Sequence, residues 1–278
     1  MFKYIVLLLF LLPGLICAQT VEECMDCHSD EEMTGFISDT VEVSMYVDLE
    51  KFQKSIHGDM ECIDCHSSVE DVDHDEDLPE VICADCHEDS EEEYRQSIHG
   101  LLANNGSTIF SGCKNCHGTH DIFASDDSSS HTFVLNIENT CGKCHSREDV
   151  ISILGLKGKG PAIAYHESVH NNILSEQPEK GAPTCNSCHG SHNIYLMSDP
   201  RSTFNKVNRA ETCGECHEKE KEEYYKSIHW HGVERGHFEA PTCNDCHGEH
   251  GIMSPQDKDA VTNRLHLSSQ ICANCHAS

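Results

Sequence analysis

Residues 113–120 read Cys-Lys-Asn-Cys-His-Gly-Thr-His, and this stretch decides how the rest of the chain is interpreted. Two cysteines three positions apart run directly into His117, and a second histidine, His120, follows three positions later. Cysteine pairs with this spacing occur in zinc sites and in redox-active thiol pairs. Neither use requires a histidine immediately after the second cysteine.

The Cys-x-x-Cys-His motif occurs nine times, and we number its copies from first to ninth in chain order. Only Cys17 of the 19 cysteines lies outside a motif. The cysteine pairs are Cys24/Cys27, Cys62/Cys65, Cys83/Cys86, Cys113/Cys116, Cys141/Cys144, Cys185/Cys188, Cys213/Cys216, Cys243/Cys246 and Cys272/Cys275. The histidines that complete them are His28, His66, His87, His117, His145, His189, His217, His247 and His276.

This motif is the attachment signature of c-type haem. Two thiols on one turn bind the vinyl groups along one edge of the porphyrin, and the following imidazole binds the iron as proximal ligand. The chain therefore resembles the multihaem c-type cytochromes, and among them the cytochrome c3-like proteins, whose haem irons carry two histidines. The resemblance covers Cys24 to His276 and implies nine covalently bound haem c groups.

The composition predicts the fold class. The 278 residues include 6% aromatic residues and a single Trp, which is little material for the apolar core that a chain of this length should bury. We therefore expect haem groups to fill the interior. The predicted fold is mainly α-helical and irregular, with short helices and loops wrapped around a nine-haem core and little β-structure.

Thirteen histidines remain outside the motifs, and seven of them recur in two patterns. Three follow a motif histidine as Cys-His-Gly-x-His, and four end a Ser-Ile/Val-His segment. The two axial ligands of one iron approach from opposite faces of the porphyrin, so His117 and His120, on one turn, cannot bind the same iron. We predict that all seven are distal ligands of neighbouring haems: His57, His99, His120, His170, His192, His229 and His250.

Each Ser-Ile/Val-His segment has an aromatic residue four positions before its Ile or Val. This spacing predicts short amphipathic helices that carry both side chains on one face. The histidines are expected at the helix ends, with Gly100 as a helix C-cap. The seven patterned histidines leave two distal positions without an assigned ligand, for which six candidates remain: His74, His131, His166, His231, His237 and His266. Complete bis-histidine ligation is therefore not demanded.

The chain divides into a predicted signal peptide and one multihaem domain. Residues 1–18 combine Lys3, an apolar run and small residues before a cleavage site after Ala18, so that Cys17 is lost with the signal. Residues 19–278 form the nonahaem domain. Its imperfect two-haem repeats span about 24–82, 83–140, 141–212 and 213–271, followed by a terminal single-haem motif at 272–278.

The formal net charge of −29 argues against nucleic-acid binding, which requires basic patches. Acidic runs are typical of a solvated surface and can also steer basic redox partners. No later segment is apolar for long enough to span a membrane, so we expect an exported protein, periplasmic or extracellular, without a stable membrane span.

The resemblance implies electron transfer, without enzymatic activity, through mostly bis-histidine haems in anaerobic respiration. Its redox partners would be a quinol-oxidising donor and a terminal reductase or an extracellular acceptor. Two alternatives stay open. One is a multihaem oxidoreductase of the nitrite or hydroxylamine type with one open haem, and the other is a subunit of an extracellular cytochrome filament or another homo-oligomer.

Overall fold

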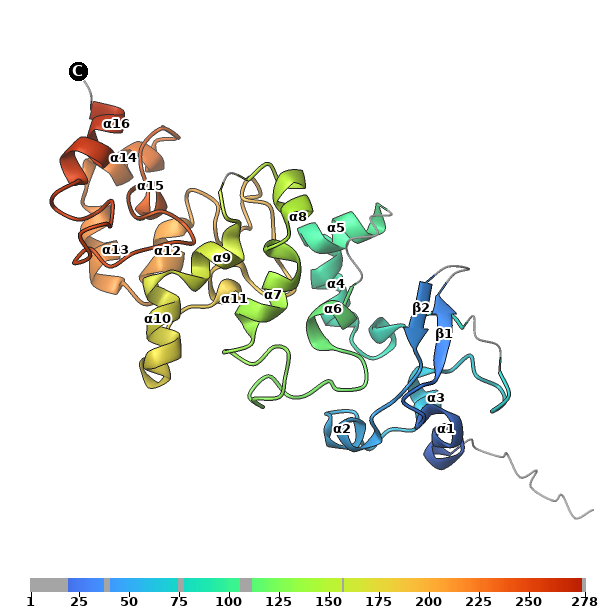
Figure 1. Ribbon diagram of the computed structural model, residues 1–278. Helices are drawn as coiled ribbons and strands as arrows, with labels where there is room; N and C mark the ends of the chain where they lie inside the picture. Colours follow the sequence, from blue (N-terminus) through green and yellow to red (C-terminus); the bar gives the residue numbers. More distant parts are fainter. Residues whose placement is uncertain (1–19, 38–40, 75–77, 106–111, 157, 277–278) are drawn as a thin grey trace, which may run out of the picture. The chain divides into compact units, whose positions relative to one another are not determined.

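The computed structural model describes residues 20–37, 41–74, 78–105, 112–156 and 158–276 (Figure 1). The predicted signal segment 1–18, with Cys17, lies outside these residues. Contacts divide the chain into two compact units. Unit 1 comprises Met1–Gln53 and Gly58–Ile82, and unit 2 comprises Lys54–His57 and Cys83–Ser278. In the part of the chain that is described, no helix combines the length and apolarity needed to cross a membrane.

Unit 1 holds the first two motifs and the one small sheet of the described residues. Strands β1 (Thr34–Ile37) and β2 (Val41–Ser44) pair antiparallel, with Thr34 opposite Ser44. The helices are α1 (Val21–His28), α3 (Cys62–Cys65) and most of α2 (Leu49–Lys54). Thr20 begins α1 with a capping box that its side chain forms with Glu23.

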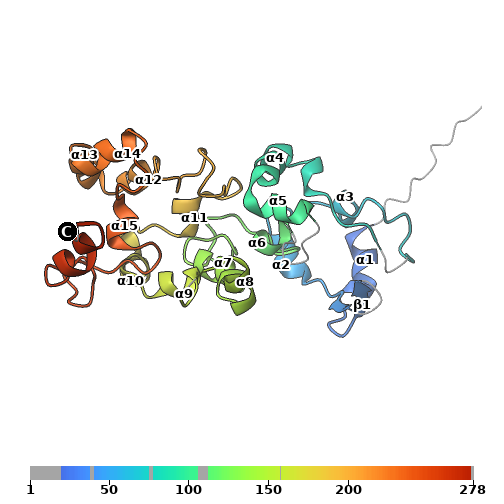
Figure 2. The ribbon, with the colours of Figure 1, turned by 90° about the horizontal axis from the view of Figure 1, so that it is seen from above.

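Unit 2 is a succession of short helices and loops (Figures 1 and 2). Its first half contains the 3-10 helix η1 (Cys83–Asp85), α4 (Glu88–Gln96), α5 (Ile98–Asn104), α6 (Lys114–His117), α7 (Ile137–His145), α8 (Glu148–Ile153), α9 (Pro161–His166) and α10 (Val169–Glu176). Its second half contains η2 (Pro178–Lys180), α11 (Cys185–His189), α12 (Arg209–Gly214), α13 (Glu218–Tyr225), α14 (Ile228–Glu234), α15 (Cys243–His247), the π-helical η3 (Leu267–Cys272) and α16 (Ala273–His276).

These elements confirm a mainly helical and irregular fold with little β-structure. Few apolar side chains are buried among the described residues, and they are spread along unit 2 rather than collected in one core. They are Ile137, Val150, Ala162, Tyr165, Leu174, Ala210, Val233 and Ala260. So small a buried set leaves the polypeptide short of the apolar packing that usually holds a chain of this size together.

The expectation that histidines end the aromatic helices was wrong. Helix α4 ends at Gln96, and Ser97 then caps a new helix, α5, by accepting a hydrogen bond from the Gly100 N–H at 3.1 Å. His99 is therefore the second residue of α5, and Gly100 is a buried residue inside it rather than a C-cap. A Cβ at Gly100 would collide with the Tyr94 carbonyl oxygen, which explains why glycine stands there.

The same break recurs in the next two repeats. Ser168 begins α10 and Ser227 begins α14, each through its side-chain oxygen. The serine of the pattern is thus a helix N-cap, and the structural reason is the preference of serine for that position. Each histidine is consequently the second residue of a new helix.

The loops that lead into the fifth, seventh and ninth motifs are held by the same kind of hydrogen bond, from one side chain to backbone carbonyls within the loop. The Asn136 amide donates to the carbonyls of Ser128 and Ser130, and the Asn208 amide donates to those of Pro200 and Ser202. In the last loop, the ring of His266 takes this place, with Nε2 2.8 Å from the Lys258 carbonyl oxygen.

The last loop also has one residue more than its counterparts. It runs from Asp257 to Cys272, whereas the earlier loops run from Asp127 to Cys141 and from Asp199 to Cys213. A π-helical turn, η3, absorbs the additional residue directly before the ninth motif.

Candidate haem-binding site

Each motif sits on a short helix whose ends are fixed locally. Thr184 and Thr242 are buried N-caps of α11 and α15, each in a capping box with the residue three positions later. The helices end at Gly190 and Gly248, with φ of 83° and 80°. Only glycine adopts this conformation readily, so the glycine of Cys-His-Gly-x-His turns the chain away from the motif before the second histidine.

Tyrosines of the preceding helices hold the start of the next motif. The Tyr165 hydroxyl donates to the Pro183 carbonyl at 2.9 Å, and the Tyr224 hydroxyl donates to the Pro241 carbonyl at 2.9 Å. Both prolines lie two residues before the first cysteine of a motif. Tyr165 and Tyr224, the aromatic residues before two Ser-Ile/Val-His segments, therefore fix the backbone that leads into the next cysteine pair. Their spacing in the sequence did not indicate this role.

All eighteen motif cysteines are free thiols, as haem attachment requires. The first cysteines of consecutive motifs contact each other in pairs. The thiols of Cys62, Cys113, Cys141 and Cys213 donate hydrogen bonds to the sulfurs of Cys24, Cys83, Cys185 and Cys243, respectively. Burial, followed by the neighbouring thiol, raises the pKa of Cys62 and of Cys113 to about 11.

The motif cysteines differ in how far other parts of the polypeptide cover them. Eight are exposed and the other ten are partly buried. The physical reason is that the motifs lie on helical turns of a few residues with few apolar side chains packed over them. A porphyrin edge can reach a thiol only where other side chains do not cover it. The exposed cysteines are Cys27, Cys65, Cys83, Cys86, Cys116, Cys216, Cys272 and Cys275.

The second cysteines connect these pairs to one another within unit 2. Cys116 of the fourth motif interacts electrostatically with Cys144 of the fifth, and Cys188 of the sixth with Cys216 of the seventh. Cys246 of the eighth motif lies in the same way beside Cys272 and Cys275 of the ninth. The cysteine pairs of the third to the ninth motif therefore follow one another in space in the order of the sequence.

Within the described residues, seven ring contacts join a motif imidazole to an imidazole from outside the motifs, with ring centres 5.9–6.3 Å apart. A metal ion that binds one imidazole nitrogen on each side at about 2.0–2.1 Å keeps the two ring centres roughly 6 Å apart. The residues present therefore fit an iron with two axial histidines. The pairs are His28/His74, His87/His57, His117/His192, His145/His99, His189/His250, His217/His170 and His276/His229.

The two histidine patterns reach their partners in opposite directions. A Ser-Ile/Val-His histidine faces the second motif downstream, as His99 faces His145. A Cys-His-Gly-x-His histidine faces the motif two positions upstream, as His192 faces His117. His192 and His250 each face the histidine of another motif rather than that of their own.

A backbone hydrogen bond joins the two patterns. The Ile98 N–H donates to the Ile194 carbonyl at 2.8 Å, and the Val169 N–H donates to the Ile252 carbonyl at 2.7 Å. The Ile56 N–H donates to the Ile122 carbonyl at 2.9 Å. In each case the donor precedes a Ser-Ile/Val-His histidine directly, and the acceptor lies two residues after a Cys-His-Gly-x-His histidine. The patterns thus come together as paired segments.

Burial favours the neutral form that binds metals in six of the fourteen paired imidazoles. It lowers the pKa of His99, His117, His145, His170 and His250. It lowers the pKa of His189 to about 4, with help from the neighbouring His250 and His145. Burial likewise lowers the pKa of His66.

The six histidines outside the patterns divide into two groups. His74 stacks on His28, with 9° between the ring planes, and so fits the distal position of the first motif. The other five do not face a motif histidine at ring-stacking distance in the described residues. His131 lies beside Asp121, His166 bonds Glu138, His231 lies beside Glu234, His266 bonds Lys258, and His237 is exposed.

The roles of His66 as a proximal ligand and of His120 as a distal ligand stay predictions. His66 directly follows α3 and is half-buried in unit 1, and the half-buried His120 follows α6 in unit 2. No group of three or more His, Cys, Asp or Glu side chains in the described residues is arranged to hold a metal ion. The imidazole pairs are thus the arrangement that suits a metal here.

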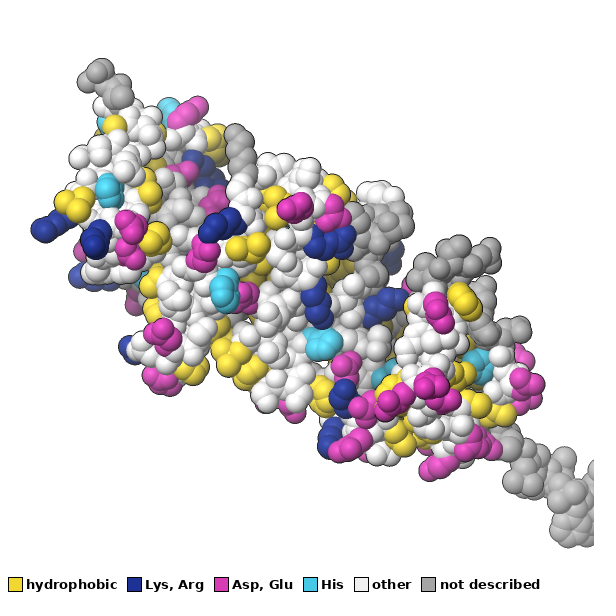
Figure 3. Space-filling view, in the orientation of Figure 1, with side chains coloured by type: hydrophobic (Ala, Val, Ile, Leu, Met, Phe, Trp, Pro, Cys, Tyr) yellow, Lys and Arg dark blue, Asp and Glu magenta, His cyan; other side chains and the backbone are white. Residues whose placement is uncertain are grey.

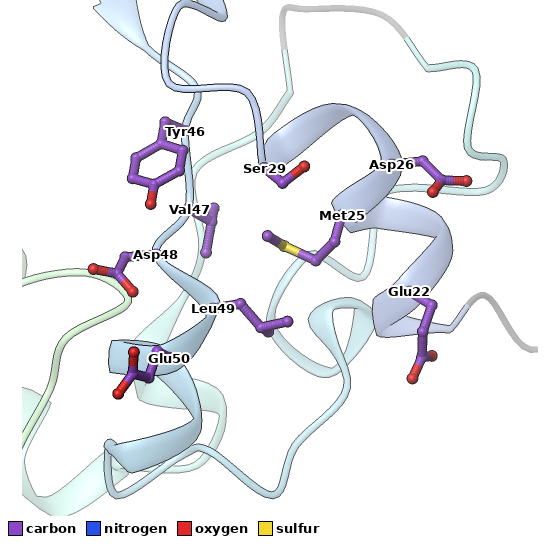
Figure 4. A pocket seen from close by; sticks show the side chains of 9 residues that line it. All are labelled: Glu22, Met25, Asp26, Ser29, Tyr46, Val47, Asp48, Leu49 and Glu50. Atoms are coloured by element: carbon purple, nitrogen blue, oxygen red, sulfur yellow. The ribbon is translucent and has the colours of Figure 1, made fainter.

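A separate pocket of about 480 Å³ lies in unit 1, between α1 and the segment before α2 (Figure 4). Met25, Val47 and Leu49 point into it, and carboxylates such as Asp26 and Glu50 stand at its rim. Figure 3 shows Asp and Glu gathered on the face of unit 1. The lining contains no cysteine or histidine, but Met25 and Asp26 are the two residues between the cysteines of the first motif, so the pocket adjoins that motif.

Comparison with known proteins gives one informative match. The chain is 24% identical over 206 residues to the multiheme cytochrome MtrA of Shewanella baltica (strain OS185). The match covers 70% of this chain and 52% of the relative, so it spans about half of the relative's length. No protein-family model and no solved structure matches the chain. The similarity supports a multihaem cytochrome.

Proposed function

We propose that this protein is an exported electron carrier with nine covalently attached c-type haems, mostly bound by two histidines. The observation that carries the proposal is the set of seven imidazole pairs at 5.9–6.3 Å, each with one member in a Cys-x-x-Cys-His motif. The similarity to a multihaem cytochrome supports it independently. When bound, each haem supplies one iron that changes between the ferric and ferrous states.

The residues would hold each haem from three sides. One cysteine pair fixes an edge of the porphyrin, the motif histidine binds one axial position, and the facing histidine binds the other. Two histidine ligands leave no coordination site for a substrate, which favours transfer over catalysis. Buried neutral imidazoles suit this task because only the neutral ring has a free nitrogen lone pair.

The order of the cysteine pairs supports transfer along the chain. In unit 2, contacts alternate between first cysteines, such as Cys213 with Cys243, and second cysteines, such as Cys188 with Cys216. Groups attached to these thiols would lie beside their sequence neighbours. The acidic surface suits steering of basic redox partners, a donor at one end and a reductase or extracellular acceptor at the other.

Intact mass and redox titration test the proposal. The protein, expressed from its full sequence in a host that matures c-type cytochromes, should carry nine haems that acid-acetone does not extract. A reductive titration should take up one electron per haem. Pigment released by acid-acetone, or a mass without attached haem, would overturn the proposal.

A further inference from the structure

The eighth motif differs from its neighbours in what faces its histidine. His247 is exposed, and no imidazole ring faces it at stacking distance in the part of the chain that the structure describes. His217, the imidazole that acts on it electrostatically, faces His170 instead. The histidines of the sixth, seventh and ninth motifs face His250, His170 and His229, respectively.

The motif itself is intact. Helix α15 has the same buried threonine cap, the same capping box and the same left-handed glycine as α11 of the sixth motif. Its first cysteine, Cys243, accepts a hydrogen bond from Cys213, as Cys185 accepts one from Cys141. Attachment is therefore as well prepared at the eighth motif as at the sixth. Only the side opposite the motif histidine differs.

A second observation concerns the same missing segment, the one that would place an imidazole opposite His247. In the three earlier Ser-Ile/Val-His segments, the N–H before the histidine donates to a Cys-His-Gly-x-His segment. The corresponding Ile228 N–H has no protein partner among the described residues, and the Ile228 side chain is 82% exposed. By the repeating arrangement, the segment that would bond Ile228 is also the one that would present a histidine to His247.

Two of the three unassigned histidines in this part of the sequence have other partners. His266 uses both ring nitrogens, at 2.8 Å from the Lys258 carbonyl and 3.1 Å from the Gln270 amide. His231 lies 3.6 Å from a Glu234 carboxylate oxygen on its own helix. The exposed His237 makes no ring contact with His247 in the described structure.

We propose that the haem held by Cys243, Cys246 and His247 keeps its sixth coordination position open to small exogenous ligands that bind haem iron. The proposal rests on the proposed haem content and adds a ligand-binding site to it. Suitable probes are imidazole for the oxidised protein and carbon monoxide for the reduced protein. The site gives one haem of an electron carrier a different potential and a ligand response that its bis-histidine neighbours lack.

Electron paramagnetic resonance of the oxidised 278-residue protein tests the proposal. The spectrum should contain high-spin iron equal to one haem, and imidazole should convert it to low spin. The reduced protein should bind one carbon monoxide per chain. A wholly low-spin spectrum with no carbon monoxide uptake overturns the proposal, whether the sixth ligand comes from this chain or from a second copy. The haem count from intact mass stays at nine in that case, so failure of the site is distinct from failure of the proposed function.

Two pairs of substitutions locate the site. Cys243→Ser with Cys246→Ser should remove one haem together with the high-spin signal. The matched control, Cys185→Ser with Cys188→Ser, should remove one haem and leave that signal in place. Where the first variant does not fold, His247→Met keeps both thioether bonds and should alter the high-spin signal. A high-spin signal that survives both changes at the eighth motif belongs to another haem and overturns the assignment.

Discussion

The imidazole rings of His117 and His192 lie with their centres 5.9 Å apart, although two haem-binding motifs separate them in the sequence. His117 follows the cysteine pair of the fourth motif, and His192 follows the sixth. The contact therefore ties two repeats together through one proposed iron. Removing one member should affect a single haem and leave covalent attachment intact, because attachment needs only the motif.

His192→Ala should convert the haem of the fourth motif from low spin to high spin. Its reduction potential should rise, since a basic imidazole that stabilises ferric iron is lost. Intact mass should still show nine haems. Electron paramagnetic resonance should show high-spin iron increased by one haem over the parent protein.

His131→Ala is the matched control for this substitution. His131 is half-buried and lies beside His117 in space, but its Nε2 atom is 3.5 Å from an Asp121 carboxylate oxygen, and it does not face His117 at ring-stacking distance. We expect no additional high-spin iron in this variant. Equal spectra for the two variants would contradict the assignment of His192 as a distal ligand.

The sequence allowed the ligand types to be predicted but not the pairing. Seven patterned histidines were selected by recurrence alone, and the structure places six of them opposite a motif histidine. Which motif each one faces depends on the fold of the intervening loops. Nothing in the local sequence around His99 and His192 shows that one faces downstream and the other upstream.

The sequence also did not allow us to predict that each expected helix is divided in two at its serine. The spacing of Tyr94 and Ile98 matches a continuous helical face, and serine is tolerated within helices. The structure instead uses Ser97 as a cap, because the buried serine oxygen satisfies the N–H of Gly100 at the start of a second helix. The element common to the breaks at Ser97, Ser168 and Ser227 is the serine itself, which local spacing rules do not distinguish from a serine inside a helix.

Ser168→Ala should lower the free energy of unfolding by about 0.5–2 kcal/mol, the usual cost of losing a helix N-cap. Ser168 is fully buried, and its side-chain oxygen accepts a hydrogen bond from the Asn171 N–H at 3.2 Å. Urea unfolding followed by the haem absorbance should show the loss. Ser175→Ala, an exposed change in the same helix, is the control and should change stability little.

Tyr224→Phe should loosen the start of the eighth motif without removing its haem. The Tyr224 hydroxyl bonds the Pro241 carbonyl, and burial raises the pKa of Tyr224 to about 12, so the hydroxyl stays protonated as a donor at neutral pH. The lost hydrogen bond should cost about 0.5–1.5 kcal/mol. Faster hydrogen exchange at Thr242 and Cys243, measured by mass spectrometry, would show the effect. Tyr46→Phe in unit 1 should leave exchange at these positions unchanged.

His266→Asn should preserve both stability and all haem spectra. Asn208 occupies the same place in the preceding loop and makes two hydrogen bonds to the carbonyls of Pro200 and Ser202, at 2.9 and 2.8 Å. An asparagine at position 266 can serve the same carbonyl positions, of which the Lys258 oxygen is one. If His266 were instead a distal ligand, the asparagine variant would gain one high-spin haem.

His266→Ala distinguishes a role of His266 in holding its loop from a role as an iron ligand. It removes the hydrogen bond to Lys258 without a replacement, so the thermal unfolding temperature should fall while the spin state of every haem stays that of the parent. The asparagine variant should retain the parent's unfolding temperature, because it restores the bond that alanine lacks. High-spin iron in both variants would instead identify His266 as an iron ligand, and equal destabilisation of both would show that the loop depends on the imidazole ring itself.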